Sequence, residues 1–409
     1  MSYQFADDFI WGTSTSGHQV EGNNTQSDFW VMEHVEPTIF AEASGDACDQ
    51  YHRYDEDIQM LAGLGFNAYR FSVEWARIEP EHGLYSTAAL DHYRQVLEAC
   101  HRHGISPIVT YHHFASPRWV AAGGGWAEMA TAAWFGEYAE RVTRHLGDLI
   151  SHVCTINELN ISALIAEFKG TILPAEAIDG MLAAAARTCG SDRFSAFLVG
   201  EAEAIEPVVL AAHHAGVEAI RSVRPNLPVG MTVAMSDYQA EEGGEEMMEA
   251  KREKIQDLYL REAGDGDFIG VQCYSRSRYG PDGILPPEEG FETTQMGYEF
   301  WPQCVEACVR HGVAITGLPA IVTENGIGTD DDTRRIAYLG EALAGLRRCL
   351  EDGIKVRGYC QWSLLDNFEW MMGYKPTFGI VAVDRKTQER TPKPSASWLG
   401  EIARNNAVA

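Results

Sequence analysis

The chain has 409 residues, 45% of them hydrophobic, which is enough to bury a large core. Its 59 acidic and 32 basic side chains give a formal net charge of -27 at pH 7, which repels nucleic acid phosphates and anionic membrane surfaces. We therefore expect neither a nucleic acid nor a membrane as a partner.

The amino-terminal residues 1–8 lack the basic and apolar regions of a signal peptide. No apolar run approaches the roughly 18 residues that a membrane span needs. The nine cysteines include no C-x-x-C pair, and an odd number of scattered thiols is typical of a reducing compartment. We expect a cytoplasmic protein.

Short apolar or β-branched runs alternate along the chain with segments of helical period. Eight runs predict strands, at Phe9–Gly12, Ala68–Val73, Ser106–Tyr111, Val153–Ile156, Val229–Ala234, Phe268–Gln272, Ala320–Thr323 and Val356–Trp362. The segments of helical period include Leu90–His103, Ala130–Leu149, Val208–Val223, Tyr298–His311 and Thr333–Gly353. Eight such units predict a closed (β/α)8 barrel around a parallel sheet.

No linker rich in proline, glycine or serine divides the chain, and its composition does not shift along its length. The most polar stretch, Glu241–Glu246, is a short acidic loop followed by the helix-like segment Met247–Leu260. Because (β/α)8 barrels often exceed 250 residues as one unit, we expect residues 1–409 to form a single domain.

Several predicted strands end in a side chain that could take part in chemistry. These side chains are Arg70, His113, Glu158, Tyr274, Glu324 and Trp362. In a barrel they would meet at the carboxyl ends of the strands, where such folds place their active sites. Glu158 and Glu324 lie 166 positions apart, and a pair of carboxyl groups is what cleavage of a glycosidic bond requires.

Other barrel chemistries find no support in the sequence. An aldolase would need a Schiff-base lysine at a strand end, and an enolase-type enzyme a carboxylate triad for a metal; we find neither. No His/Asp/Glu cluster has zinc-like spacing, so we expect no metal. The run Gly123-Gly124-Gly125 has no lysine and follows no predicted strand, so it does not indicate a phosphate loop. We expect no cofactor.

Several motifs, between Phe9 and about Trp398, resemble glycoside hydrolase family 1, the family of retaining β-glucosidases. The resemblance is carried by Phe9–Thr13, His18–Gly22, Tyr51–Pro80, Trp362–Trp370, Gly373-Tyr374 and Phe378-Gly379. It implies a (β/α)8 barrel and a double displacement through a covalent glycosyl-enzyme. A sugar-binding relative that had lost catalysis would be expected to lack one of the two carboxyl groups, and both are present.

The resemblance also implies the catalytic roles. Glu324 would be the nucleophile that attacks the anomeric carbon, and Glu158 would be the acid and then the base. Arg70 would keep Glu324 ionised, and Tyr274 would donate a hydrogen bond to it. An ordinary structural ion pair at the barrel rim is the alternative for Arg70. Retention requires the two carboxyl groups to lie about 5 to 5.5 Å apart, so the barrel must close their separation in sequence.

Residues for sugar recognition follow from the same resemblance. Gln19 and Glu369 would bind hydroxyl groups at the far end of the sugar, and His113 and Trp370 those in the middle. Asn157 would bind the 2-hydroxyl group, next to the reacting carbon.

The aromatic positions complete this set. Trp362 would form the floor under the sugar. Glu369 and Phe378 occupy a loop where the phosphosugar branch of the family carries serine, lysine and tyrosine, so we expect an unphosphorylated sugar. Of the adjacent His112 and His113, whose side chains point to opposite faces of a strand, the resemblance selects His113 for the pocket and leaves His112 structural.

The chain departs from the family pattern at four positions. Leu159 follows Glu158 where the family usually has proline, and Gln272 and Cys273 replace an asparagine and an aromatic residue near the nucleophile. Glu74 stands where many members carry a small residue, and we expect it to form a salt bridge at the rim.

These features predict an exo-acting β-glucosidase for small or aryl β-glucosides, with β-galactosides or β-fucosides as further substrates. A transglycosylase that passes the glycosyl group to an alcohol is the alternative. Because loops at the rim shape the leaving-group site, the sequence does not identify the natural aglycone. It also leaves the oligomeric state open, a homo-oligomer included.

Overall fold

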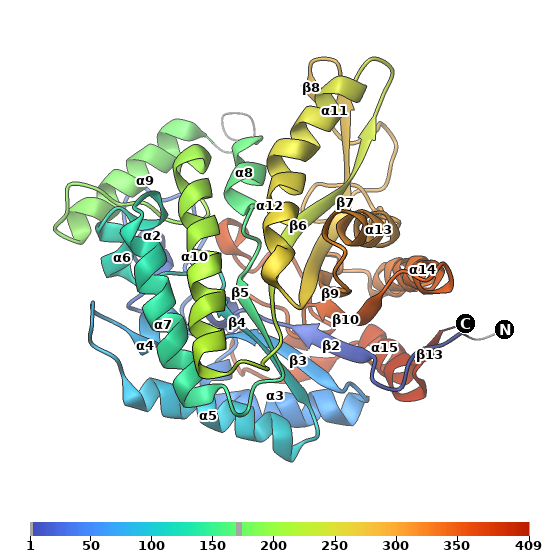
Figure 1. Cartoon of the computed structure of the whole chain (residues 1–409), viewed down its shortest axis with the longest axis horizontal. Coiled ribbons are helices and arrows are strands. Elements are labelled where there is room, and N and C mark those ends of the chain that lie inside the picture. The colour runs from blue at the N-terminus through green and yellow to red at the C-terminus, as the bar shows by residue number, and fades with distance from the viewer. Residues whose placement is uncertain (1–2, 169–173, 409) are drawn as a thin grey trace.

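The computed structural model describes residues 3–168 and 174–408 (Figure 1). Eight strands form its barrel: β2 (Ile10–Ser14), β3 (Ala68–Ser72), β4 (Ser106–His112), β5 (His152–Ile156), β6 (Val229–Ala240), β7 (Phe268–Gly280), β9 (Ala320–Asn325) and β10 (Val356–Trp362). Neighbours in this series pair in parallel, β10 pairs with β2, and the β6–β7 pairing closes the ring. The predicted (β/α)8 barrel is confirmed.

Helices surround this barrel (Figure 1). The longer ones are α3 (Gln50–Leu64), α5 (Thr87–Arg102), α7 (Ala130–Leu146), α9 (Ala175–Thr188), α10 (Ala202–Val223), α13 (Cys304–Thr316), α14 (Asp332–Glu351) and α15 (Pro394–Asn405). The shorter ones are α1 (Gly17–Val20), α2 (Asp28–Glu33), α4 (Trp75–Ile78), α6 (Arg118–Ala122), α8 (Ile161–Ala166), α11 (Glu245–Arg252) and α12 (Leu258–Arg261). Within residues 3–168 and 174–408, no helix has both the length and the apolar content of a membrane span.

Several minor elements complete the structure. They are the strands β1 (Tyr3–Gln4), β8 (Gly283–Ile284), β11 (Val381–Val383), β12 (Arg390–Pro392) and β13 (Ala407–Val408), the 3-10 turns η1 (Gly125–Ala127), η3 (Glu262–Asp265) and η4 (Trp370–Met372), and the π-helical turn η2 (Glu253–Asp257). Because β1 pairs with β13, the first and last described segments lie together (Figure 1).

The amphipathic pattern of helix α5 explains its place in the outer ring. Ser86 caps the start of helix α5, because its hydroxyl accepts a hydrogen bond from Ala89 N and so satisfies a free amide of the first turn. Leu90, Tyr93 and Leu97 recur at helical spacing and are buried. These side chains form one apolar face, which packs on the barrel and leaves the polar face in water.

Small and apolar side chains fill the barrel interior. Ala68, Ile108, Cys154, Phe268, Ile321 and Cys360 form a separate, fully buried cluster from six different strands. Gly12 is tightly enclosed there, because a Cβ added to it would lie 2.9 Å from Cys360 Sγ. Arg70 lies two residues beyond Ala68 on β3 and therefore points to the same interior face, one layer nearer the carboxyl ends of the strands.

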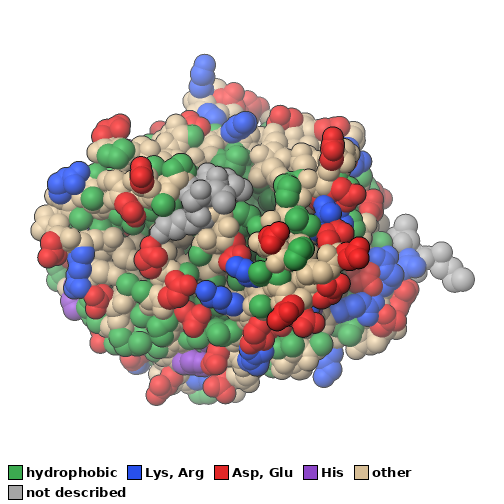
Figure 2. All heavy atoms as spheres, turned by 90° about the horizontal axis from the view of Figure 1, so that it is seen from above, with side chains coloured by type: hydrophobic (Ala, Val, Ile, Leu, Met, Phe, Trp, Pro, Cys, Tyr) green, Lys and Arg blue, Asp and Glu red, His purple; other side chains and the backbone are tan. Residues whose placement is uncertain are grey.

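Strands β6 and β7 are longer than their apolar runs predict. Their parallel pairing continues past the rim as far as Ala240 and Tyr279, and α11 follows at the tip (Figure 1). Figure 2 views the molecule from this end, and acidic side chains lie scattered across the whole face rather than in one patch. The carboxyl ends of the barrel strands face the same side.

The prediction of a helix over Tyr298–His311 is wrong at its start. Helix α13 begins only at Cys304, and Tyr298 lies in the preceding loop, where its carbonyl accepts a hydrogen bond from Thr294 N. Pro302 explains the difference, because the residue before a proline is disfavoured in the helical conformation. The loop thereby places Tyr298 near the carboxyl ends of the strands.

Candidate active site

The expected site residues gather at the carboxyl ends of the barrel strands. They come from α1, from strands β3, β7, β9 and β10, from the segments that follow β4 and β5, and from the loop after β10. Most of these side chains are buried. The set comprises Gln19, Arg70, His113, Asn157, Glu158, Tyr274, Glu324, Trp362, Glu369, Trp370 and Phe378.

The carboxylate of Glu324 is held by three donors. Arg70 Nη1 lies 2.6 Å and Gln272 Nε2 2.8 Å from Glu324 Oε1, and the Tyr274 hydroxyl donates to Glu324 Oε2 at 2.6 Å. Arg70 is fully buried, so this ion pair is shielded from water. The donors favour the charged form of the Glu324 carboxylate and set its direction.

Asn157 shares two of these donors. Its Oδ1 accepts hydrogen bonds from Arg70 Nη2 at 2.5 Å and from Gln272 Nε2 at 2.9 Å. Its Nδ2 is buried and has no partner within the described residues. The amide is therefore oriented with a free donor, although a buried amide normally finds a partner.

Other buried polar atoms at the site also lack partners in the described part of the chain. Gln19 Oε1, His113 Nδ1 and Gln272 Oε1 share this property with Asn157 Nδ2. Donors and acceptors that are buried and unpaired in one place suit a ligand with many hydroxyl groups.

The electrostatic environment shifts the pKa values of the two carboxyl groups to different extents. Burial raises the pKa of both Glu158 and Glu324. At Glu324 the shift is opposed by Arg70 and by the Tyr274 hydroxyl, whereas at Glu158 the negative charges of Glu324 and Glu369 add to it. Arg70 also lowers the pKa of Glu158, but it donates a hydrogen bond only to Glu324 of the two, so the pKa of Glu158 is raised the more.

Three rings of the expected sugar-binding set stack on one another. His113 stacks on Trp362, with ring centroids 5.7 Å apart, and on Trp370 at 6.2 Å. Burial, followed by the charge of Arg70, holds the pKa of His113 well below its usual value, so its ring is neutral. His112 faces the other way, against Trp126 at 4.7 Å, which agrees with a structural role.

Glu369 lies in the loop that follows β10. Gln19 Nε2 and Asn367 Nδ2 approach its Oε2 at 3.4 and 3.5 Å. Burial, together with the charge of Glu324, raises the pKa of Glu369 to about 8. The Phe378 ring closes the same loop against Tyr274, with centroids 6.0 Å apart.

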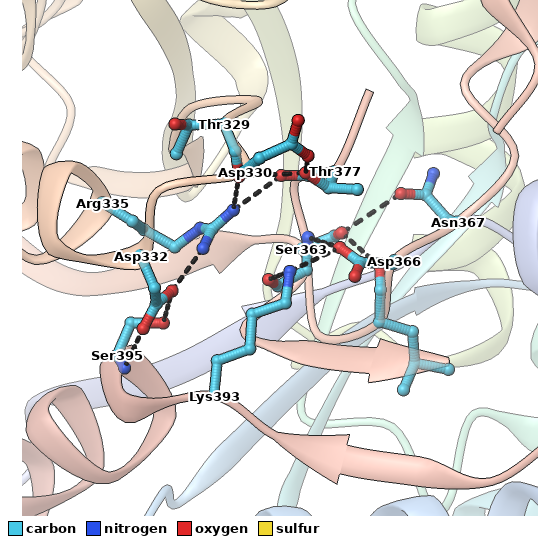
Figure 3. A network of polar contacts seen from close by, with 12 residues as sticks. Thr329, Asp330, Asp332, Arg335, Ser363, Asp366, Asn367, Thr377, Lys393 and Ser395 are labelled. Atoms are coloured by element: carbon cyan, nitrogen blue, oxygen red, sulfur yellow. Dashed lines mark hydrogen bonds and ion pairs between the residues drawn. The ribbon is translucent and has the colours of Figure 1, made fainter. Parts of the chain in front are cut away.

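A network of polar contacts anchors the loop that follows β10 (Figure 3). Asp366 Oδ1 accepts from Lys393 Nζ at 2.8 Å and from Gly379 N at 2.9 Å. Arg335 is buried, donates to the carbonyls of Thr329 and Thr377 at 2.8 and 2.6 Å, and pairs with Asp332. The loop that carries Glu369 is thereby tied to α14 and to the start of α15.

Two residues of the site have no role in the sequence interpretation. Gln272 appears there only as a departure from the family pattern, whereas the structure bonds it to Glu324 and Asn157. Tyr298 lies 6.4 Å from Tyr274, ring to ring, and the charges of Glu369 and Glu158 contribute, after burial, to its raised pKa. The turn residue Gly297 and the proline at 302 are the sequence signals that mark Tyr298 as a loop residue.

The interpretation of Glu74 as a salt bridge at the rim is wrong. Glu74 is buried, and within the described residues no ion pair involves it. It accepts hydrogen bonds from Asn24 Nδ2 at 2.7 Å and from the Ser72 hydroxyl at 3.3 Å. Gly17 provides the space, because a Cβ there would lie 2.6 Å from Glu74 Oε1. Burial, together with the charge of Glu21, raises the pKa of Glu74 to about 7.

Glu74→Gln should stabilise the protein at alkaline pH. The folded-state pKa of Glu74 lies above its unfolded value of 4.5, so its contribution to stability is complete below pH 4.5 and is lost as pH rises through 7. An amide cannot ionise and escapes this loss. Urea denaturation measures the free energy of unfolding of the variant and of the wild type at both pH values. We expect the difference, variant minus wild type, to be more favourable at pH 8.5 than at pH 5 by about 1–3 kcal/mol. Glu98→Gln, at a side chain that is 48% exposed, should show no such difference.

Comparison with known proteins agrees with this geometry. The model of glycosyl hydrolase family 1 matches residues 1–272 and 286–408. Beta-glucosidase A of Thermotoga maritima is 30% identical over 447 residues, covering 99% of each chain, and the bifunctional beta-D-glucosidase/beta-D-fucosidase of Bifidobacterium breve is 30% identical over 452 residues, covering 97% and 98%. The crystal structure of beta-glycosidase BGL167 superposes with a TM-score of 0.94 at 52% identity, covering 99% of this chain and 98% of that one. The chain therefore belongs to glycosyl hydrolase family 1 and is a glycoside hydrolase.

Proposed function

We propose that this chain is an exo-acting, retaining β-glucosidase of small or aryl β-glucosides, with Glu324 as nucleophile and Glu158 as acid and base. The observation that carries the proposal is the unequal support of the two buried carboxyl groups. Arg70, Gln272 and Tyr274 all donate to Glu324, whereas no hydrogen bond reaches the Glu158 carboxyl within the described residues. One group is prepared to attack as an anion and the other to give up a proton.

In the first step, a Glu324 oxygen forms a bond to the anomeric carbon while the bond to the leaving oxygen breaks. Glu158 donates its proton to that oxygen, so the aglycone leaves as a neutral alcohol. Esterification removes the charge of Glu324, which is one cause of the raised pKa of Glu158. That pKa then falls, and Glu158 can accept a proton from the water that hydrolyses the ester.

The unpaired polar atoms support the proposed sugar contacts. Gln19 and Glu369 would bind the far hydroxyl groups, while neutral His113 and Trp370 would bind the middle ones. The free Nδ2 of Asn157 would donate to the 2-hydroxyl group, a contact that strengthens as charge develops at the anomeric carbon. Trp362 would lie under the ring and Phe378 at the entrance.

We further propose that residues 1–409 act as one catalytic domain and that the protein works in the cytoplasm. All nine cysteines are free thiols. Free thiols that persist, eight of them buried, suit a reducing compartment.

A panel of 4-nitrophenyl glycosides tests the substrate class. We expect turnover of the β-glucoside and the β-fucoside, as the names of the relatives suggest, and none of the α-glucoside. Proton NMR of the reaction should show β-glucose as the first-formed product, because two displacements restore the configuration. The appearance of α-glucose first would exclude the proposed mechanism. Chromatography of the products, with and without an alcohol, measures the share of transfer against hydrolysis.

A further inference from the structure

The segment that carries Asn157 and Glu158 is fastened to strand β6 beyond the regular sheet. The ladder between β5 and β6 pairs Val153 with Val229 and Cys154 with Gly230, and continues no further. The connection resumes at Thr232. Its hydroxyl accepts a hydrogen bond from Glu158 N at 2.9 Å, and its carbonyl accepts one from Leu159 N at 3.1 Å. One buried residue therefore holds two successive amides.

Asn160 secures the other side of the same segment. Its Nδ2 donates to the carbonyls of Ala234 and Ile255 at 2.7 and 2.8 Å, and its Oδ1 accepts from Ala234 N at 2.9 Å. Ala234 belongs to β6 and Ile255 to the π-helical turn η2. Asn160 is fully buried. Its side chain therefore links this segment by hydrogen bonds to the barrel strand β6 and to the turn η2.

Leu159 sets this chain apart from the usual family pattern. The family usually has proline at this position, and proline has no N–H to donate to the Thr232 carbonyl. Glu158 also has a φ of 44°, in the left-handed region that non-glycine residues adopt rarely. A residue before proline is pushed towards extended conformations, whereas a residue before leucine is free of that restriction. Leu159 therefore both adds a hydrogen bond and permits the observed backbone of Glu158.

The backbone of Glu158 matters because its side chain has no other support. Glu324 is directed by three side-chain donors, but within the described residues no hydrogen bond fixes the Glu158 carboxyl. A proton donor must lie within hydrogen-bond reach of the leaving oxygen to be effective. For Glu158 that aim can come only from the main chain and from packing.

We infer that Thr232 is the positioning residue of the acid/base Glu158, with the amide of Leu159 as its second anchor. The inference rests on the proposed role of Glu158 as proton donor. In the proposed mechanism, Thr232 touches neither the sugar nor the reacting atoms. It acts by holding the main chain from which the Glu158 side chain projects.

The test compares leaving groups. Dinitrophenolate departs without a proton, whereas phenolate needs one, so only the phenyl glucoside depends on the aim of the acid. In Thr232→Val, which keeps the shape and the carbonyl but removes the hydroxyl, we expect kcat/KM for phenyl β-glucoside to fall about tenfold or more. The kcat/KM for 2,4-dinitrophenyl β-glucoside should change by less than about threefold. Leu159→Pro, which removes the second amide, should act in the same direction.

Three matched variants complete the design. Thr110→Val makes the same substitution at a buried threonine on β4 whose side chain has no hydrogen bond to residues 156–160 in the described part of the chain, and we expect kcat/KM to change by the same factor for both substrates. Thr232→Ser keeps the hydroxyl and should keep the wild-type ratio of the two rates. Glu158→Gln shows the ratio that complete loss of the acid produces.

Two outcomes separate the inference from the proposed function. If Glu158→Gln lowers both substrates equally, Glu158 is not the acid and the proposed role fails. If Glu158→Gln discriminates between the substrates but Thr232→Val and Leu159→Pro do not, the role stands and the positioning inference is overturned. Should Thr232→Val fail to fold, Thr232→Ser and Leu159→Pro carry the comparison, and an unchanged ratio in Leu159→Pro then overturns the inference.

Discussion

Glu324→Gly should abolish turnover of 4-nitrophenyl β-glucoside, with a loss of roughly 10⁴ to 10⁶ in kcat. The variant lacks the group proposed to form the glycosyl-enzyme, while Glu158 and the proposed sugar contacts stay in place. The space left by the side chain admits a small anion such as azide. Azide then attacks the anomeric carbon from the face that Glu324 occupied, and a single displacement yields the α-glucosyl azide. Absorbance at 400 nm measures the rate, and NMR of the purified product gives its configuration.

The outcome of this experiment is decisive for the nucleophile. Recovery of the β-azide, or a rate close to that of the wild type, would refute the assignment of Glu324. Glu74→Gln is a suitable control, because Glu74 is also a buried carboxyl group but, among the described residues, accepts hydrogen bonds from Asn24 and Ser72 rather than from any residue of the site. We expect that variant to retain activity on the same substrate.

Glu158→Ala should show a loss that depends strongly on the leaving group. For substrates that need protonation, we expect kcat/KM to fall about 10² to 10⁴-fold, the usual contribution of a general acid. For 2,4-dinitrophenyl β-glucoside, kcat/KM should stay near the wild-type value. Azide should raise kcat, since it attacks the glycosyl-enzyme without help from a base, and the product should be the β-glucosyl azide.

The pH profile provides an independent check on the same residue. In the wild type, kcat/KM should fall on the alkaline side as Glu158 loses its proton, at a pH well above the ordinary range of a glutamate, because burial and the charge of Glu324 raise its pKa. It should fall on the acid side as Glu324 gains a proton. In Glu158→Ala the alkaline limb should disappear. A limb that persists unchanged would show that another group controls it.

Much of the fold follows from local sequence pattern. Each of the eight apolar runs overlaps a barrel strand, because a strand buried on both faces needs a short continuous run such as Ala320–Thr323. The extension of β6 and β7 past the rim does not follow from it. Residues 236–240 are only partly buried, and they form a strand because β7 supplies hydrogen-bond partners as far as Tyr279. Tertiary pairing, rather than apolar pattern, sets that boundary.

The site divides in the same way. The residue types and their places at strand ends could be predicted from sequence, together with the roles that the family resemblance implies. The sequence does not reveal that Gln272 bonds to Glu324 and Asn157, or that Tyr298 joins the site from a loop. These contacts join positions up to 115 residues apart, and side-chain reach across a closed barrel has no signature in a linear pattern.

Glu74 shows the limit most clearly. A carboxyl group near a strand end predicts a solvated ion pair, and only the packing against Gly17 and Asn24 places it in the interior with a raised pKa. The sequence by itself determined the barrel and the identity of the chemical groups, because periodicity and residue type are local properties. The tertiary structure decided how the pKa values of the two carboxyl groups are shifted and how the main chain at Glu158 is held, because both depend on neighbours that the closed ring of strands brings together.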